Sequence, residues 1–279
     1  MEKIQSAIEK ARAARVLSGA DALIAPEIAA AASSGATPDQ TVAAAWSDLQ
    51  PYGEDNPARL RRNRIVSLTR GKDTVPFDMM RTKVLQQMRA NGWKRLAITS
   101  PTPSCGKSTI ALNLAFSLTR QAELRVILGE LDLHHPSLAK MLGITGRHGF
   151  AAVLEGQNSF ASVALRHGAG LALAVNDGAV RNPSELLQSS SVAPALAALE
   201  AIYAPDIMLF DMPPMLVSDD VMAFMGHVDA VLLIAAAETT TTKEIDTCER
   251  ELAAQTNVMG VVLNKCHFMG KDYGYSYYS

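Results

Sequence analysis

The sequence has little cysteine, almost no net charge and no long apolar run. Its three cysteines, Cys105, Cys248 and Cys266, are an odd number at unrelated spacings, which fits neither a disulfide framework nor a metal site. A formal net charge of −2 argues against a dedicated nucleic-acid-binding protein. No apolar run approaches the roughly 20 residues that span a bilayer, and the N-terminal MEKIQSAIEKARAAR lacks the apolar core of a signal peptide. We therefore expect a soluble, cytoplasmic protein without a nucleic-acid partner.

What the sequence does contain is a phosphate-binding loop. In the run RLAITSPTPSCGKST, residues 95–109, an apolar strand leads into a loop that ends in G-K-S-T, and a helical run follows. Pro101 replaces the first glycine of the pattern G-x-x-x-x-G-K-[ST], but strand, loop and helix follow in the required order. Backbone N–H groups at a helix start bind phosphates, while Lys107 reaches the outer phosphates and Ser108 reaches Mg²⁺. The predicted nucleotide-binding residues here are Pro103, Ser104, Cys105, Gly106, Lys107, Ser108 and Thr109.

Apolar runs alternate with helical patterns along the rest of the chain. The predicted strands are 95–100, 124–131, 171–175, 206–211, 230–236 and 258–264, and the predicted helices include 110–119, 184–203 and 243–255. Near-continuous apolar strands are typical of a parallel sheet that helices cover on both faces. We expect a doubly wound α/β domain, with a mostly parallel sheet, over residues 73–265.

Acidic residues follow two of the predicted strands. Period-2 alternation puts Glu130 and Asp132 on the same side after the second strand, and Asp211 ends another strand in D-M-P-P, a Walker B arrangement. Mg²⁺ keeps several waters and takes one or two carboxylates plus phosphate oxygens. We expect Ser108, Asp132 and Asp211 to hold it, directly or through water. Helix N-capping is the alternative role for the two aspartates.

These motifs together resemble the bacterial tyrosine kinases of polysaccharide synthesis and export. The resemblance covers roughly residue 77 to the C-terminus and includes the phosphate loop, a second acidic motif of the form D-x-D-x-x-x-P, and D-x-P-P followed by Asp219. The segment N-P-S-E-L-L at 182–187 is similar to the one that leads to that family's Walker B strand. The resemblance implies the P-loop NTPase fold, ATP as phosphoryl donor and autophosphorylation of tail tyrosines. It also implies a membrane-embedded polysaccharide co-polymerase as activating partner.

Four of the six tyrosines lie in the C-terminal tail, residues 266–279. Small polar neighbours leave them accessible as phosphate acceptors, and the alternative is an aromatic tail that docks on a partner or on its own domain. In the mechanism that the resemblance implies, Lys107 and Mg²⁺, held by Asp132 and Asp211, neutralise the developing charge. The first acid of the second motif, here Glu130, takes the phenol proton. The predicted acceptors are Tyr273, Tyr275, Tyr277 and Tyr278.

The chain departs from the family pattern at several positions. Glu130 replaces the usual Asp and extends the carboxylate by about 1.5 Å. Ser104 stands where glycine is usual and Cys105 where glutamate is frequent; a positive φ at Ser104 would cost about 1–2 kcal/mol. Asp78 and Arg81 match the family's E-x-x-R-x-x-R oligomerisation motif, but position 84 is not arginine. The motif predicts a homo-oligomer, while ring assembly and full catalytic strength stay open.

Residues 1–72 precede the predicted domain. We expect a helix over 1–17 that needs a partner surface, and then a mostly mobile linker over 18–56 with a helix near 41–49. The basic stretch over 59–72 is interpreted as a solvated arm, and the alternative is contact with an acidic partner or with the inner face of the plasma membrane.

Two other functions fit parts of the pattern. A positioning ATPase of the partition class shares the Walker motifs. Proteins of that class carry a signature lysine early in the phosphate loop, and this chain has Thr102 at the equivalent position, which favours the kinase. A nucleotide-binding regulatory subunit that has lost transfer activity is favoured by the altered Glu130, Ser104 and Cys105. Asn264 resembles the position where related ATPases contact the adenine base, and an end-of-strand turn is its alternative role.

Overall fold

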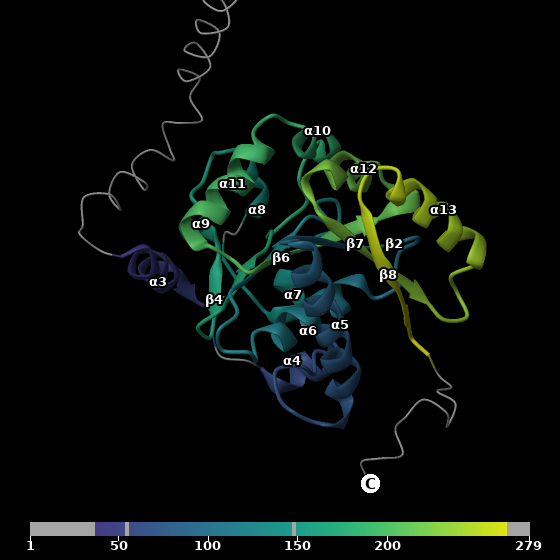
Figure 1. Cartoon of the computed structure of the whole chain (residues 1–279), viewed down its shortest axis with the longest axis horizontal. Coiled ribbons are helices and arrows are strands. Elements are labelled where there is room, and N and C mark those ends of the chain that lie inside the picture. The colour runs from purple at the N-terminus through teal and green to yellow at the C-terminus, as the bar shows by residue number, and fades with distance from the viewer. Residues whose placement is uncertain (1–36, 54–55, 147–148, 267–279) are drawn as a thin grey trace, which may run out of the picture.

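The predicted parallel strands are confirmed, and they form a continuous run, from β5 to the edge strand β8, of one eight-stranded sheet in the described part of the chain (Figure 1). The computed structural model describes residues 37–53, 56–146 and 149–266. The sheet order is β1-β4-β5-β3-β6-β2-β7-β8, and only β4 and β5 pair antiparallel. The strands are β1 Gln50–Pro51, β2 Arg95–Ser100, β3 Val126–Glu130, β4 Leu165–His167, β5 Leu171–Ala174, β6 Ile207–Pro214, β7 Ala230–Ala236 and β8 Asn257–Asn264.

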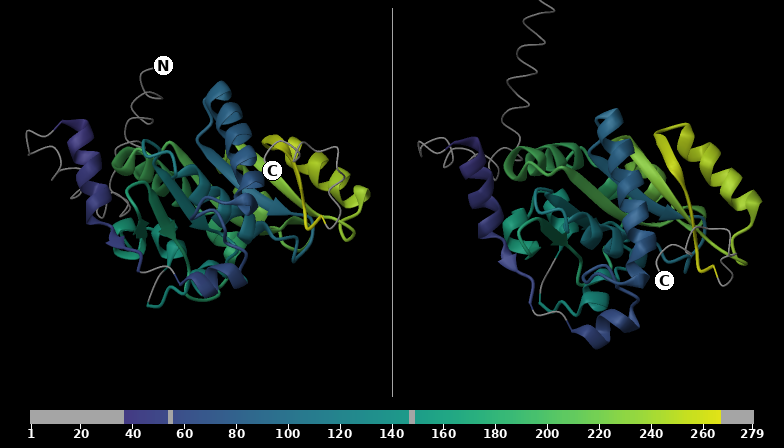
Figure 2. Two further views of the ribbon diagram at one scale, coloured as in Figure 1. Left: turned by 90° about the horizontal axis from the view of Figure 1, so that it is seen from below. Right: turned by 60° about the horizontal axis from the view of Figure 1, so that its bottom comes forward.

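Helices cover both faces of the sheet, so the expected α/β class is confirmed. α4–α7 pack on one face, in an apolar cluster with strand residues such as Leu96 and Ile98, and the remaining helices pack on the other, around Ala97. α3 and α13 lie at opposite ends of the sheet (Figure 2). The helices are α3 Pro38–Asp48, α4 Pro57–Arg62, α5 Val75–Asn91, α6 Lys107–Leu118, α7 Leu138–Leu142, α8 Phe150–Leu154, α9 Phe160–Val163, α10 Pro183–Leu187, α11 Val192–Tyr203, α12 Asp220–Phe224 and α13 Thr242–Ala253, with short 3₁₀ turns at Lys72–Thr74, Met215–Val217 and Met225–His227.

The structure differs from the sequence expectation in three elements. The helix expected over 184–203 is two helices, α10 and α11, separated by a serine-rich turn in which the Ser189 and Ser191 hydroxyls bond to each other at 2.7 Å. Serine side chains compete for backbone groups and so favour such a break. The short strands β1 and β4, the first two in the sheet order, were not predicted, because two or three residues carry no periodic signal.

The chain ahead of β2 contributes more to the core than we expected. α3 begins at Pro38 and buries Trp46, whose indole N–H donates to the Tyr203 carbonyl of α11 at 2.7 Å. α4, residues 57–62, includes the start of the basic stretch, and its Leu60 is buried. This part of the stretch is therefore folded and is not a solvated arm. The helix expected over residues 1–17 lies outside the described residues.

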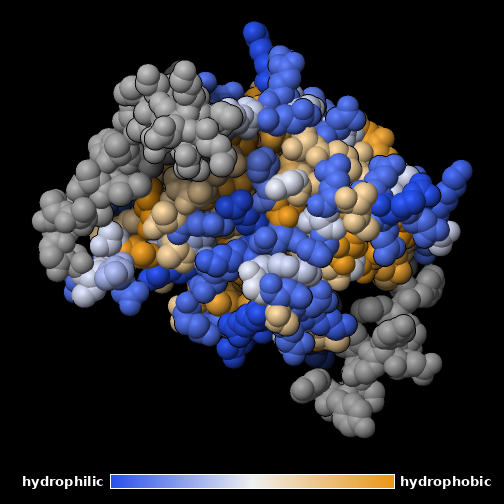
Figure 3. All heavy atoms as spheres, turned by 45° about the horizontal axis from the view of Figure 1, so that its top comes forward, coloured by the Kyte–Doolittle hydropathy of each residue, from blue (hydrophilic) through white to orange (hydrophobic). Residues whose placement is uncertain are grey.

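Polar and apolar residues are interspersed on the face of the molecule in Figure 3. None of the helices within residues 37–53, 56–146 and 149–266 is both long enough and apolar enough to cross a bilayer.

Candidate nucleotide site

The phosphate loop and the acidic residues meet at one edge of the sheet. β6 lies between β2 and β3, so Asp211 pairs in register with Ile98 on one side and with Glu130 on the other. Because parallel strands end at the same edge, this register brings three segments together. They are the phosphate loop (residues 101–106), the acidic loop (residues 131–137) and the end of β6.

The phosphate loop has the backbone that a phosphate cradle needs. Gly106 has φ 94° and leads directly into α6, so the first turn of α6 carries Ser108 and Thr109 as predicted. Pro103 and Ser104 are exposed. Ser104 adopts φ 64°, and this confirms the condition under which its side chain is strained.

Ser104→Gly is expected to stabilise the protein by about 1 kcal/mol, because glycine adopts a positive φ without the Cβ strain that serine carries. Chemical denaturation of both proteins measures the difference. An unchanged or lower unfolding free energy in Ser104→Gly would show that the loop is not strained at this position.

Asn264 holds the phosphate loop at its glycine. Its side-chain amide donates to the Cys105 carbonyl at 2.8 Å, and a Cβ at position 106 would lie only 2.3 Å from the Asn264 amide nitrogen. Only glycine therefore fits at 106. The predicted adenine contact of Asn264 stays a prediction, while its contact with the loop is direct.

The Cys105 side chain points away from the mouth of the loop. It is 1% exposed, and its thiol donates to the Thr102 carbonyl at 3.2 Å. Burial raises the pKa of the thiol, but contacts with Thr240 and Thr102 outweigh it and hold the pKa below its usual value. Cys105 thus contributes its backbone to the loop rather than a side chain to the ligand.

Lys107 is paired with the second acid of the acidic loop. Its Nζ lies 2.6 Å from Asp132 Oδ2, and both side chains are largely buried. Burial lowers the pKa of the ammonium, but the charges of Asp211 and Asp132 outweigh burial and raise the pKa. Lys107 is therefore a positive charge held in place by Asp132 at the first residue of α6, where the phosphate loop ends.

Asp211 is a buried carboxylate without a hydrogen-bond partner in the described part of the chain. It is 0% exposed, and neither of its side-chain oxygens accepts a hydrogen bond there. Burial raises its pKa to about 6, although Lys107 and the nearby Ser108 hydroxyl act in the opposite direction. A lone buried carboxylate beside a hydroxyl and a phosphate loop fits Mg²⁺, which takes few protein ligands and completes its shell with phosphate and water.

The Glu130 carboxylate is buried and bonded to backbone N–H groups. It is 0% exposed and accepts N–H groups from Ser137 at 2.5 Å, Leu138 at 2.7 Å and Asn176 at 2.8 Å. Burial raises its pKa to about 7, against the effect of these backbone donors. The Glu130 carboxylate therefore holds the acidic loop and the start of α7, and its catalytic role stays a prediction.

Two further polar residues surround the acidic loop. Asn176 donates to the Glu130 carbonyl at 2.9 Å, and the buried Asp220 lies 3.3 Å from His134 Nε2. Sequence reasoning missed both, since Asn176 follows β5 outside every motif and Asp220 lies next to Asp219, the residue that the motif emphasised. The predicted acceptors Tyr273, Tyr275, Tyr277 and Tyr278 lie outside the described residues.

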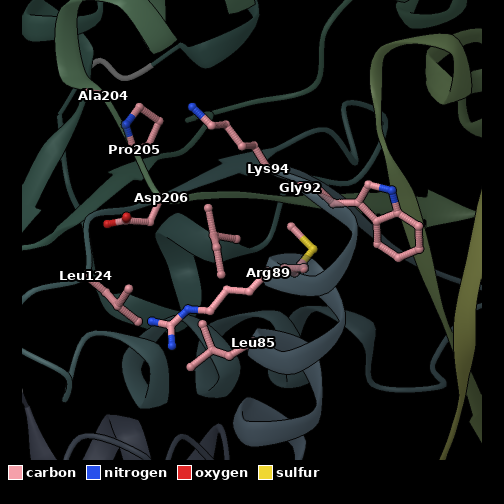
Figure 4. A pocket seen from close by; sticks show the side chains of 11 residues that line it. Leu85, Arg89, Gly92, Lys94, Leu124, Ala204, Pro205 and Asp206 are labelled. Atoms are coloured by element: carbon pink, nitrogen blue, oxygen red, sulfur yellow. The ribbon is translucent and has the colours of Figure 1, made fainter.

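A separate cavity of about 250 Å³ lies where the parallel strands begin, at the edge of the sheet opposite to the nucleotide site (Figure 4). Its lining comes from the start of β2 and β6 and the end of α5, and it includes Arg89, Lys94 and Asp206. It is remote from the carboxyl ends of the strands and is not part of the nucleotide site.

Comparisons with known proteins find relatives in sequence and in fold. A ParA family model, described as an NUBPL iron-transfer P-loop NTPase, matches residues 93–278. Tyrosine-protein kinase YwqD of Bacillus subtilis is 27% identical over 223 residues, 78% of this chain and 92% of YwqD. Tyrosine-protein kinase wzc of Salmonella typhimurium is 30% identical over 188 residues, 66% of this chain but 26% of wzc. The crystal structure of the VpsO kinase domain superposes with a TM-score of 0.61 at 30% identity, covering 68% of this chain and 93% of that domain. The chain thus spans about a quarter of the length of relatives such as wzc, and nearly all of YwqD.

Proposed function

The chain belongs to the bacterial tyrosine kinases, a family of P-loop NTPases, and on this premise we propose that it is an ATP-dependent tyrosine autokinase. The observation that carries the proposal is the set of charges around the phosphate loop: a buried lysine, its partner Asp132 and the unpartnered carboxylate of Asp211. Phosphoryl transfer is mostly positioning and charge stabilisation, and this arrangement supplies both. The acceptors proposed are the four tyrosines of the C-terminal tail.

Backbone groups and side chains of the site bind different parts of Mg-ATP. N–H groups of the phosphate loop and of the first turn of α6, which includes Ser108 and Thr109, bind the phosphates. Neither Asp211 oxygen has a hydrogen-bond partner within the described chain, whereas Asp132 is held by Lys107 until nucleotide binds, and by the His135 N–H at 3.2 Å. We therefore assign Mg²⁺ to Ser108 and Asp211. When bound, the ion neutralises charge on the outer phosphates.

Asp132 rather than Glu130 is the acceptor for the phenol proton. Nucleotide phosphates compete with Asp132 for Lys107, and when the ammonium turns to the phosphates one carboxylate oxygen is released. We infer that this oxygen faces the transferred phosphate, while the hydrogen bonds of the Glu130 carboxylate are made to backbone N–H groups inside the protein. A tyrosine hydroxyl with a pKa of about 10 needs such a nearby base to react at neutral pH.

Incubation with Mg-ATP is expected to produce phosphotyrosine in the wild-type protein and none in Lys107→Met. A variant with Phe at positions 273, 275, 277 and 278 should bind ATP normally and acquire no label, because only the acceptors are missing. Antiphosphotyrosine detection and a mass-spectrometric phosphosite map measure both. ATP binding without any phosphotyrosine, alone or with a co-expressed membrane partner, would instead identify a nucleotide-binding regulatory subunit, which the strained Ser104 and the buried Glu130 favour.

The partners we propose are a membrane-embedded polysaccharide co-polymerase and further copies of this chain, at the cytoplasmic face of the membrane. Exposed apolar side chains after β6 and on the edge strand β8 offer surfaces for them, namely Leu216, Val217, Val261 and Leu263. Asp78 and Arg81 of the oligomerisation motif are engaged within the chain, because both contact Ser117 of α6. Self-association therefore requires either surfaces other than this pair or a rearrangement of it.

A further inference from the structure

Residues 56–67, which we call the clamp, contact two helices: α6, which follows the phosphate loop, and α7, which follows the acidic loop. The clamp consists of α4 and the turn after it, where Arg64 has φ 56°. Its apolar side chains Leu60 and Ile65 are buried in the same cluster as Ile110 and Leu114 of α6. Burial fastens the clamp to the domain, and its polar contacts give it two precise points of attachment.

The first attachment is Asn113, a fully buried amide in the apolar helix α6. Its Oδ1 accepts the backbone N–H groups of Val66 at 2.8 Å and Ser67 at 3.0 Å, and its Nδ2 donates to the Arg64 carbonyl at 2.9 Å. The same Nδ2 donates to the Thr109 carbonyl at 2.8 Å, in the first turn after the phosphate loop. All donor and acceptor positions of this amide are thus used to tie the clamp to the turn that would bind the phosphates.

The second attachment is the C-terminal end of α7. Asn63 Nδ2 donates to the Met141 carbonyl at 2.9 Å, and Arg59 Nη1 donates to the Leu142 carbonyl at 3.4 Å. Gly143 makes room for the guanidinium, because a Cβ there would overlap it. The N-terminal end of α7 is held by Glu130, so α7 connects the clamp to the acidic loop.

We propose that the clamp sets the distance between the phosphate loop and the acidic loop, with Asn113 and Arg59 as positioning residues. One short segment holds both α6, which carries Lys107 and Ser108, and α7, which follows the acidic loop, through hydrogen bonds to backbone groups. Such contacts fix position rather than add apolar burial. A displacement of the clamp therefore moves Lys107 relative to Asp132. This inference rests on the proposed nucleotide site but not on the identity of the phosphate acceptor.

Two variants of the full chain test the two attachments separately. Asn113→Ala removes the α6 attachment, and the double variant Arg59→Ala/Asn63→Ala removes the α7 attachment from partly exposed positions that leave α6 intact. Asn91→Ala is the matched control, because its amide makes the same kind of bond, to the Gln87 carbonyl at 2.9 Å, on the exposed side of α5. The measurements are amide hydrogen exchange, Kd for Mg-ATP and the rate of autophosphorylation, all well below the unfolding temperature.

We expect faster exchange in residues 104–110 and 130–138, weaker ATP binding and an about 100-fold lower transfer rate, the loss typical of a 1 Å displacement at a catalytic group. Exchange in β7 and α13 should stay unchanged, as should every reading in Asn91→Ala. Faster exchange confined to the clamp, with wild-type ATP affinity, would overturn the proposal. If Asn113→Ala does not fold, the double variant decides alone. If the wild-type protein transfers no phosphate, the kinase proposal fails while exchange and ATP affinity still decide this one.

Discussion

Lys107→Met is expected to lower the affinity for Mg-ATP by about 100-fold, which is the largest effect on nucleotide binding that we expect from any single substitution. The side chain supplies the positive charge below the phosphate loop, and a hydrogen bond to a charged group is worth about 1.5–3 kcal/mol, or roughly 10- to 150-fold in Kd. The thermal stabilisation that Mg-ATP gives to the wild-type protein should disappear with it, because that stabilisation follows ligand occupancy. Calorimetry and thermal unfolding with and without Mg-ATP measure both effects.

The same substitution is expected to destabilise the protein without nucleotide. Lys107 is the partner of Asp132 at 2.6 Å, and removing one partner of a buried pair costs about 3–5 kcal/mol because the other charge stays buried. Lys83→Met is the control, since it removes an exposed lysine from α5. Unchanged ATP affinity in Lys107→Met would refute the assignment of the phosphate loop.

Stability falls as the pH rises through neutrality, and Glu130→Gln removes most of this dependence. Burial raises the pKa of Glu130 from 4.5 to about 7. A carboxyl with a raised pKa contributes stability that is complete below the unfolded pKa and is lost as the pH rises through the folded one. For Glu130 the loss amounts to about 2 kcal/mol between about pH 5.5 and about pH 8.

Urea denaturation of the wild-type protein and Glu130→Gln across that pH range measures the difference between the two slopes. Asp211, with a pKa raised to about 6, lowers stability in the same direction in both proteins, and the difference between them reports Glu130 together with its charge interaction with Asp211. The glutamine variant also carries a constant loss of about 1–3 kcal/mol, because its amide faces a backbone donor. Parallel pH curves would show that the Glu130 carboxyl does not titrate in this range.

The sequence predicted the fold class and the edge of the sheet where the site lies, because both depend on periodicity and strand order. Lys107, Asp132 and Asp211 were placed together by that reasoning, and the structure brings them together. The orientation of Glu130 was not predictable, since alternation gives the side of a strand but not the hydrogen bonds that a side chain finds there. Asn113 had a signal that we did not use: it is a lone amide within the otherwise apolar run Ile110–Ala115.

The hydrogen bond between the Asn264 amide and the Cys105 carbonyl holds the end of β8, after which the C-terminal tail begins, against the phosphate loop. Tyr273 follows Asn264 by nine residues, a contour length of roughly 30 Å at full extension. A tether of that length keeps an acceptor at millimolar effective concentration around its anchor. Under the proposed function, tyrosines of the same chain are therefore supplied to the loop at a concentration that does not depend on how much protein the cell makes. A tyrosine from a second copy of the chain must then compete with the tyrosines of the same chain for the site.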